Sequence, residues 1–450
     1  MKAQEVAERL CALAEVPAQV VVVTARQRST RLGAGVVLNN TDIDLAEAEV
    51  LVLIDGAEGR ARTTVLDDEG LKRALDVATK AARACLPNPD HPGFAGAGDA
   101  GAPTSAPAWD EATAVGHEGE GPAVGEAIDA ASARGARLAG LVLRRAERRV
   151  VANTLGLSRS DRRTVAQASW IASCGAGGGF RDEVAVRESD LHHAALAAEA
   201  ADVAVRSADP GPIEPGTWDV VLSSKAVKDL LEWLANIGFG SRAYEDGTSF
   251  LAGRRGEKLT SSAVSIWDPG PDDPLPVGFD DEGCARHRVD FLSEGVALGP
   301  VWDRASAARN GTQATGHTQG GGLFPASGAQ SRAVHMAGGD EDDLLSGLKH
   351  GLYVERFHYV NGFLDPRRAR MTGLTRDGLF EVRDGVIERA VGDLRFTENV
   401  LEAFSRIDGV SRSLHLSPCG RRGLGSFSTP AVRIRGFQFT GSAARNPGAS

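Results

Sequence analysis

The most reactive combination of side chains in this sequence is Arg356-Phe357-His358-Tyr359. Neighbouring residues of a strand point to opposite faces, so a strand here would place Arg356 and His358 on one face and Phe357 and Tyr359 on the other. An arginine can bind a carboxylate through two parallel hydrogen bonds. The segment therefore predicts either a substrate-binding strand, with Arg356, His358 and Tyr359 as candidate contacts, or a buried arginine paired with a carboxylate of the protein.

A second candidate site is Thr315-Gly316-His317. A glycine lets the backbone approach a ligand closely, and an imidazole titrates near neutral pH. Loop residues held by a rigid scaffold often carry function. Thr315, Gly316 and His317 are therefore candidates for substrate binding, and the alternative is a histidine packed beneath a neighbouring loop.

Residues 224–236 have the pattern of a helix with one carboxylate, Glu232, among apolar residues. The apolar positions follow helical spacing: Val227, Leu230, Leu231, Leu234 and Ala235. This pattern predicts a packed helix. The alternative, in which Glu232 acts as a general base or metal ligand, has no histidine nearby in the sequence to support it.

The five cysteines are widely separated and form no CxxC pair, so the sequence predicts neither a disulfide framework nor a cysteine zinc knuckle. Cys419 lies four residues after His415, and we weigh a metal site built from them against a packed thiol. No GxSxG serine motif and no phosphate-binding GxxxxGK motif occurs.

Composition limits the class of partner. The net charge is −10 over 450 residues, and 42% of residues are apolar, which favours a globular protein and argues against nucleic acid as the main partner. The first residues, MKAQEVAERL, are too charged for a secretory signal, and no apolar run is long enough to span a membrane. We therefore expect a cytoplasmic protein that binds neither nucleic acid nor membrane.

The elements that must position these candidates differ between the two halves of the chain. The first half predicts helices and strands: helices at 2–14, 69–85, 123–135 and 190–206, and strands at 19–24, 49–54, 139–156 and 163–173. Residues 86–122 contain six prolines and predict a flexible loop or insertion. Three prolines between Asp209 and Gly216 mark the best domain boundary.

The second half predicts mainly short strands, with helices at 224–236 and 396–406. Two dipeptides, Asp377-Gly378 and Asp384-Gly385, predict hairpin turns because both residues tolerate the left-handed conformations that such turns need.

Residues Gly351–Phe404 resemble the C-terminal core of the TldD/PmbA family. The shared motifs include Arg356-Phe357-His358-Tyr359, Thr315-Gly316-His317 and the Gly-rich segment Gly247–Glu257. The likeness extends over roughly 215–440 and is weaker before it. The family implies an α+β fold, with an α/β N-terminal domain (1–208) followed by a β-rich, barrel-like C-terminal domain (209–450).

The same resemblance implies a role. Catalytic TldD-type members carry an HExxxH zinc helix, but here Glu232, Trp233 and Ile237 stand at the three motif positions. Trp and Ile supply no zinc ligand, and one C-terminal thiolate, Cys419, does not make a zinc site alone. The chain thus resembles the metal-less TldE/PmbA-type subunit, with no cofactor of its own and zinc in a TldD-type partner.

The resemblance implies that the pair encloses a chamber in which peptide is hydrolysed, and that this chain binds extended peptide. Two alternatives stay open. One is a subunit acting on an amide intermediate of secondary metabolism. The other is a metal-independent hydrolase or binding protein that works alone through Arg356, His358 and His317.

Overall fold

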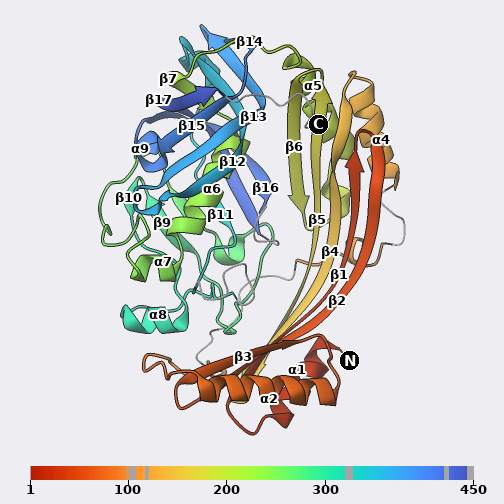
Figure 1. Cartoon of the computed structure of the whole chain (residues 1–450), viewed down its shortest axis with the longest axis vertical. Coiled ribbons are helices and arrows are strands. Elements are labelled where there is room, and N and C mark those ends of the chain that lie inside the picture. Colours follow the sequence, from red (N-terminus) through yellow and green to blue (C-terminus); the bar gives the residue numbers. More distant parts are fainter. Residues whose placement is uncertain are drawn as a thin grey trace.

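The structure is a computed structural model that describes residues 2–98, 101, 108–116, 121–319, 328–419 and 425–442. Two separate sheets dominate it (Figure 1). One is a long curved sheet from the first half of the chain, and the other is a larger sheet from the second half. Together with the helices packed on them, they confirm the predicted α+β class.

The first sheet has six strands in the order β3-β2-β1-β4-β5-β6. All its neighbouring strands run antiparallel: β1 (Ala18–Gly33), β2 (Val36–Ile54), β3 (Ala57–Thr63), β4 (Arg137–Asn153), β5 (Ser158–Cys174) and β6 (Gly177–Ala185). β1 and β2 continue well beyond the predicted strands. Their extensions are polar and pair across the ribbon, for example through Arg26 and Asp42, whose side chains are 2.6 Å apart.

Alternating residues give this sheet two different faces. Val20 and Val22 of β1 are buried beneath the helices, whereas Val21 packs toward Phe279 in the second half. The helices of the first half are α1 (Ala3–Leu13), α2 (Asp68–Ala84), α3 (Glu111–Val115), α4 (Gly121–Ser132) and α5 (His193–Arg206). Within the described residues, no helix is both long and apolar enough to cross a membrane.

The described parts of 86–122 pack against the first sheet. Ala95 is 1% exposed, and its carbonyl accepts a hydrogen bond of 2.8 Å from Asn153. The short helix α3 begins at Asp110, whose side chain accepts from the backbone N–H of Thr113. These contacts tie the segment to β4 and β5 at several points.

Part of the second sheet closes into a ring. The strands of this sheet are β7 (Gly216–Leu222), β8 (Ile266–Asp268), β9 (Val289–Ser293), β10 (Val296–Ala297), β11 (Val334–Met336), β12 (His350–Asp365), β13 (Arg370–Arg383), β14 (Val386–Ala390), β15 (Leu394–Asn399), β16 (Ile407–Pro418) and β17 (Ser426–Ser442). The α-helices of the second half are α6 (Ser224–Gly238), α7 (Ser241–Glu245), α8 (Arg304–Arg309) and α9 (Val400–Ser405). β17 pairs with both β15 and β7, so the strands β7, β12, β13, β15 and β17 close on themselves.

Helix α6 packs inside this second half. Ser223 caps it by accepting hydrogen bonds from the backbone N–H groups of Lys225 and Ala226. Its apolar residues, including Leu230, Leu231 and Leu234, are fully buried in the main hydrophobic core. The packed helix predicted at 224–236 is therefore confirmed.

Two local predictions were wrong. Residues 396–399 belong to β15, and the helix α9 begins only at Val400, because residues 396–399 pair with β13. Asp377-Gly378 lies inside β13 and forms no hairpin. The pair instead marks a break in the register with β12, with φ values of 59° and 127°. Asp384-Gly385 does form the expected turn, between β13 and β14.

Candidate functional site

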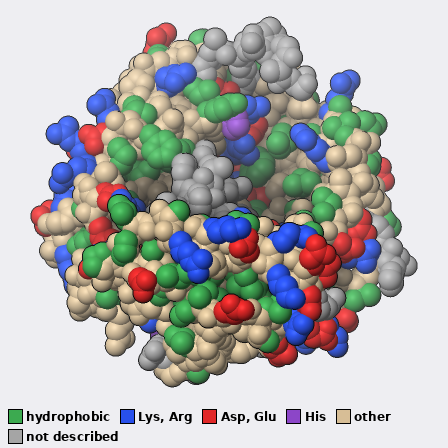
Figure 2. Space-filling model, turned by 60° about the horizontal axis from the view of Figure 1, so that its bottom comes forward, with side chains coloured by type: hydrophobic (Ala, Val, Ile, Leu, Met, Phe, Trp, Pro, Cys, Tyr) green, Lys and Arg blue, Asp and Glu red, His purple; other side chains and the backbone are tan. Residues whose placement is uncertain are grey.

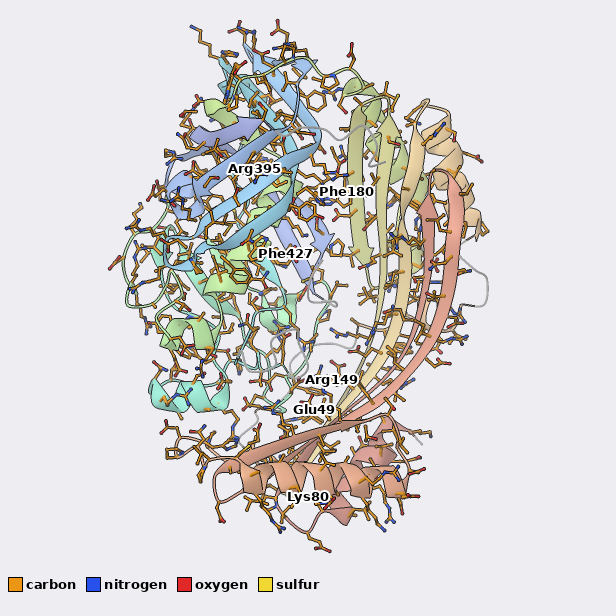
Figure 3. The ribbon with its side chains drawn as sticks, viewed as in Figure 1. Glu49, Lys80, Arg149, Phe180, Arg395 and Phe427 are labelled. Atoms are coloured by element: carbon orange, nitrogen blue, oxygen red, sulfur yellow. The ribbon has the colours of Figure 1, made fainter. Side chains whose placement is uncertain are left out.

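The molecule is deeply hollowed when viewed from the end that carries α1 and α2, and basic, acidic and apolar side chains reach the hollow (Figure 2). A cavity of about 200 Å³ lies between the edge strand β6 and the second sheet. Residues from β6, α6, β12 and β16 line it, and Phe180 of β6 lies between the two halves of the molecule (Figure 3). This cavity is the candidate site because it lies between the two halves and is lined by six charged side chains together with His358.

The polar side of α6 forms one wall. The Lys228 ammonium lies 2.8 Å from a Glu232 oxygen and 3.8 Å from Asp229. Burial alone would lower the pKa of Lys228, but the carboxylates of Asp229 and Glu232 raise it above its usual range. Burial raises the pKa of Asp229 to about 6, although Lys228 opposes the shift. Glu232, which the sequence showed as a lone carboxylate on this helix, therefore belongs to an ion-pair group with Lys228 and Asp229.

Strand β12 forms the opposite wall with Arg356, His358 and Tyr359, so the structure brings these three candidates together. The Arg356 guanidinium stacks 4.1 Å above the Phe180 ring, and its Nε lies 3.1 Å from an Asp377 oxygen. Arg356 therefore pairs with a protein carboxylate, as one of the two readings predicted, and it also lines the cavity.

The expected alternation along β12 fails at Tyr359. Phe357 is 2% exposed, but Tyr359 is 79% exposed and has φ of 51°. The pairing with β13 shifts register between His358 and Asn361, and this bulge turns Tyr359 out of the packed face. Burial and the nearby Arg376 lower the pKa of His358, which keeps its imidazole neutral at pH 7.

The sequence reading missed the part of the site that comes from β6 and β16. Asp182 Oδ1 lies 2.9 Å from His415 Nε2 and accepts a 3.1 Å hydrogen bond from Ser417. Burial raises the pKa of Asp182, but His415, Lys228 and Lys225 together lower it further, so the net shift is downward. His415 and Asp182 are 233 residues apart, so no local pattern could have joined them.

Thr315, Gly316 and His317 lie elsewhere, in a closed network. The His317 side chain is fully buried, with Nε2 3.2 Å from Asp268 and 3.1 Å from Arg286. Burial lowers the pKa of His317 despite Asp268. A Cβ on Gly316 would lie 2.2 Å from a backbone oxygen, so the glycine is needed for packing. The geometry is that of a packed histidine, and none of these three residues lines the cavity between the halves.

The three motif positions on α6 do not fit zinc. Trp233 and Ile237 are 5% and 4% exposed within the hydrophobic core, and neither has a lone pair to give to a metal. Glu232 is paired with the Lys228 ammonium. Cys419 belongs to the same core as a buried thiol, as one of the two readings of that residue predicted. No catalytic step through a metal bound on this helix can be derived.

Another group of metal-ligand types lies outside this site. The ligand atoms of Asp280, Glu282 and Cys284 are all within 4.8 Å of one another. The Asp280 oxygens accept hydrogen bonds from three backbone N–H groups, and Glu282 accepts from Thr318 and the Arg304 backbone. These hydrogen bonds give both carboxylates partners within the protein. Burial and the nearby charge of Asp280 raise the pKa of Glu282 to about 8.

Comparison with known proteins matches the second half of the chain. The model of the PmbA/TldA metallopeptidase C-terminal domain covers residues 215–441. A metalloprotease of Methanothermobacter thermautotrophicus is 26% identical over 283 residues, 60% of this chain and 59% of that protein. A metalloprotease of Synechocystis is 22% identical over 37% of each chain. The matched segments thus span well under two thirds of these relatives.

Two solved structures share the whole fold. TldE from Thermococcus kodakarensis superposes with a TM-score of 0.85 at 18% identity, over 97% of this chain and 99% of that one. A proposed modulator of DNA gyrase from Thermotoga maritima gives 0.83 at 20% identity, with the same coverage. With the family model covering half of the sequence, these findings show that the chain belongs to the PmbA/TldD family.

Proposed function

We propose that this chain is a non-catalytic, TldE/PmbA-type subunit of a heteromeric zinc metallopeptidase. It forms one side of the substrate chamber and binds extended peptide, while a TldD-type partner carries the HExxxH zinc site. The observation that carries the proposal is the state of α6, where Trp233 and Ile237 are core residues and Glu232 is held by Lys228. A helix of this kind supports packing and ligand binding but not zinc chemistry.

The edge strand β6 supports the peptide-binding part of the proposal. Among the strands that the structure describes, β6 pairs with β5 alone, and Phe180 and Asp182 place it beside the cavity. An extended peptide can add to such an edge through backbone hydrogen bonds, which depend little on side-chain identity. The charged cavity next to β6 would then contact the side chains or the end of that peptide.

The test is co-expression with a TldD-type protein from the same genome. Size-exclusion chromatography, zinc analysis and cleavage of casein are run on each chain alone and on the pair. We expect a stable complex, with zinc and cleavage only where the partner is present. Hydrolysis or stoichiometric zinc in this chain alone would overturn the proposal, and a pair that cleaves small amides but no peptide would overturn its substrate class.

A further inference from the structure

Two cations in the cavity between the halves have hydrogen-bonding capacity that the described residues do not use. The first is Lys225, in the first turn of α6, whose side chain is 11% exposed and lines the cavity. Its Nζ lies 3.7 Å from Glu355, too far for a hydrogen bond. Within the described part of the chain, the ammonium makes no closer polar contact.

Glu355 is already engaged by other groups. Arg181 NH1 donates to its Oε1. Burial raises the pKa of Glu355, yet Lys225 and Arg181 are the main causes of a net downward shift. The carboxylate therefore stays charged and keeps Lys225 in place, but it accepts a hydrogen bond from Arg181 rather than from Lys225.

The second cation is Arg356. Only its Nε faces a protein carboxylate, that of Asp377, while the guanidinium plane is held by the Phe180 ring. The two terminal nitrogens make no hydrogen bond to any residue that the structure describes. A guanidinium fixed by stacking and by one side contact presents its remaining N–H groups in a defined direction.

The acidic residues around the cavity are all engaged. Glu232 is bonded to Lys228, Asp182 to His415 and Ser417, and Asp229 accepts the backbone N–H of Phe357 at 3.1 Å. The cavity thus has unused donors and few unused acceptors. That imbalance favours an anionic ligand rich in acceptors, such as a carboxylate.

We propose that Lys225 and Arg356 together bind the C-terminal carboxylate of a peptide that enters this cavity. The inference rests on the proposed function, and it names the part of the substrate that this chain recognises. The cavity has a volume of about 200 Å³, and both cations belong to its lining.

The test measures binding to the purified full chain without a partner. Titration calorimetry measures the binding of three probes, which are N-acetyl-trialanine, its C-terminal amide and inorganic phosphate. We expect the acid to bind about 10- to 100-fold more tightly than the amide, because the amide lacks the charge that both cations meet. Lys225→Met removes most of this difference, and Arg356→Lys, which keeps the charge but loses the fork, reduces it in part.

The matched control is Lys80→Met. Lys80 is 72% exposed on the outer face of α2, far from the cavity (Figure 3), and this variant keeps the preference for the acid. Equal binding of acid and amide, no binding of either, or phosphate binding without acid binding overturns the proposal. A pair that fails to cleave peptide, while the lone chain still prefers the acid, overturns the proposed function alone. Thermal melts of each variant separate lost binding from lost folding.

Discussion

His317 and His358 both come from short polar segments of the second half, and their surroundings are opposite. His317 is fully buried in a network with Asp268, Arg286 and Thr315, and both of its ring nitrogens lie within hydrogen-bond distance of these residues. His358 lies at a cavity whose neighbouring Arg356 has donors to spare. The comparison teaches that residue type marks a candidate, whereas access to a cavity separates a packed histidine from one that a ligand can reach.

The strongest test of this contrast is Asp268→Ala, in the closed network. Asp268 is fully buried and accepts hydrogen bonds from Arg286 at 2.6 Å and Ser331 at 2.8 Å. Its removal leaves a buried guanidinium unpaired, so we expect the free energy of unfolding to fall by about 3 to 5 kcal/mol. Urea denaturation measures the loss. Asp44→Ala, at an 85% exposed carboxylate, serves as control, and a loss below about 1 kcal/mol at Asp268 would contradict the closed-network reading.

An effect of intermediate size is expected on the pH dependence of stability, through the residues that hold the loop of His317. Glu282 bonds to Thr318, and its pKa of about 8 in the folded protein lies above the ordinary value of 4.5. A raised carboxyl pKa means that the stabilisation is complete below pH 4.5 and is lost as the pH rises through 8. We expect the wild type to lose about 1 to 3 kcal/mol of stability over this range, and Glu282→Gln to lose less.

The measurement is chemical denaturation of both proteins at pH 5, 7 and 9. Glu257→Gln is the control, since its 55% exposed carboxylate pairs only with Arg254 at the surface and should leave the pH dependence unchanged. Parallel curves for Glu282→Gln and the wild type would refute the expectation.

The smallest effect is expected on the cavity side, at Tyr359. Its side chain is 79% exposed and its φ of 51° suits glycine better than tyrosine. Tyr359→Gly should therefore change stability by no more than about 1 kcal/mol, in either direction, because relief of strain offsets the extra freedom of the unfolded chain. A thermal melt that drops by much more would show that Tyr359 is part of the packed structure.

Much of the fold could be predicted from local patterns. The helices α1, α2, α5 and α6 follow their apolar periodicity, and β4 and β5 and parts of β1 and β2 coincide with predicted strands, whereas β3 and β6 were not predicted. The predicted ends were least accurate where charged residues continue a strand, as at Arg26 and Asp42, because cross-strand ion pairs replace the apolar alternation that marks a strand. The bulges at Tyr359 and Asp377 depend on how β12 pairs with β13, which no single segment encodes.

The candidate site was only half predictable. Arg356, His358 and Tyr359 could be named because they are adjacent in the sequence. Asp182 and Lys225 could not, because their role depends on β6 and α6 meeting across the interface between the halves. His317 carried the same local signal as His358, and only burial distinguishes the two.

The closed ring of strands in the second half also affects the order in which the protein folds during synthesis. Its closing pair, β7 with β17, joins the first and last strands of that half, whereas neighbours such as β4 and β5 are adjacent in the sequence. At about 5 to 20 residues per second, β7 leaves the ribosome on the order of 10 to 40 s before β17 can pair with it. During that interval the apolar side of α6 lacks the part of its cover that β17 provides. The first sheet, which is complete at Ala185, can therefore assemble before the second half.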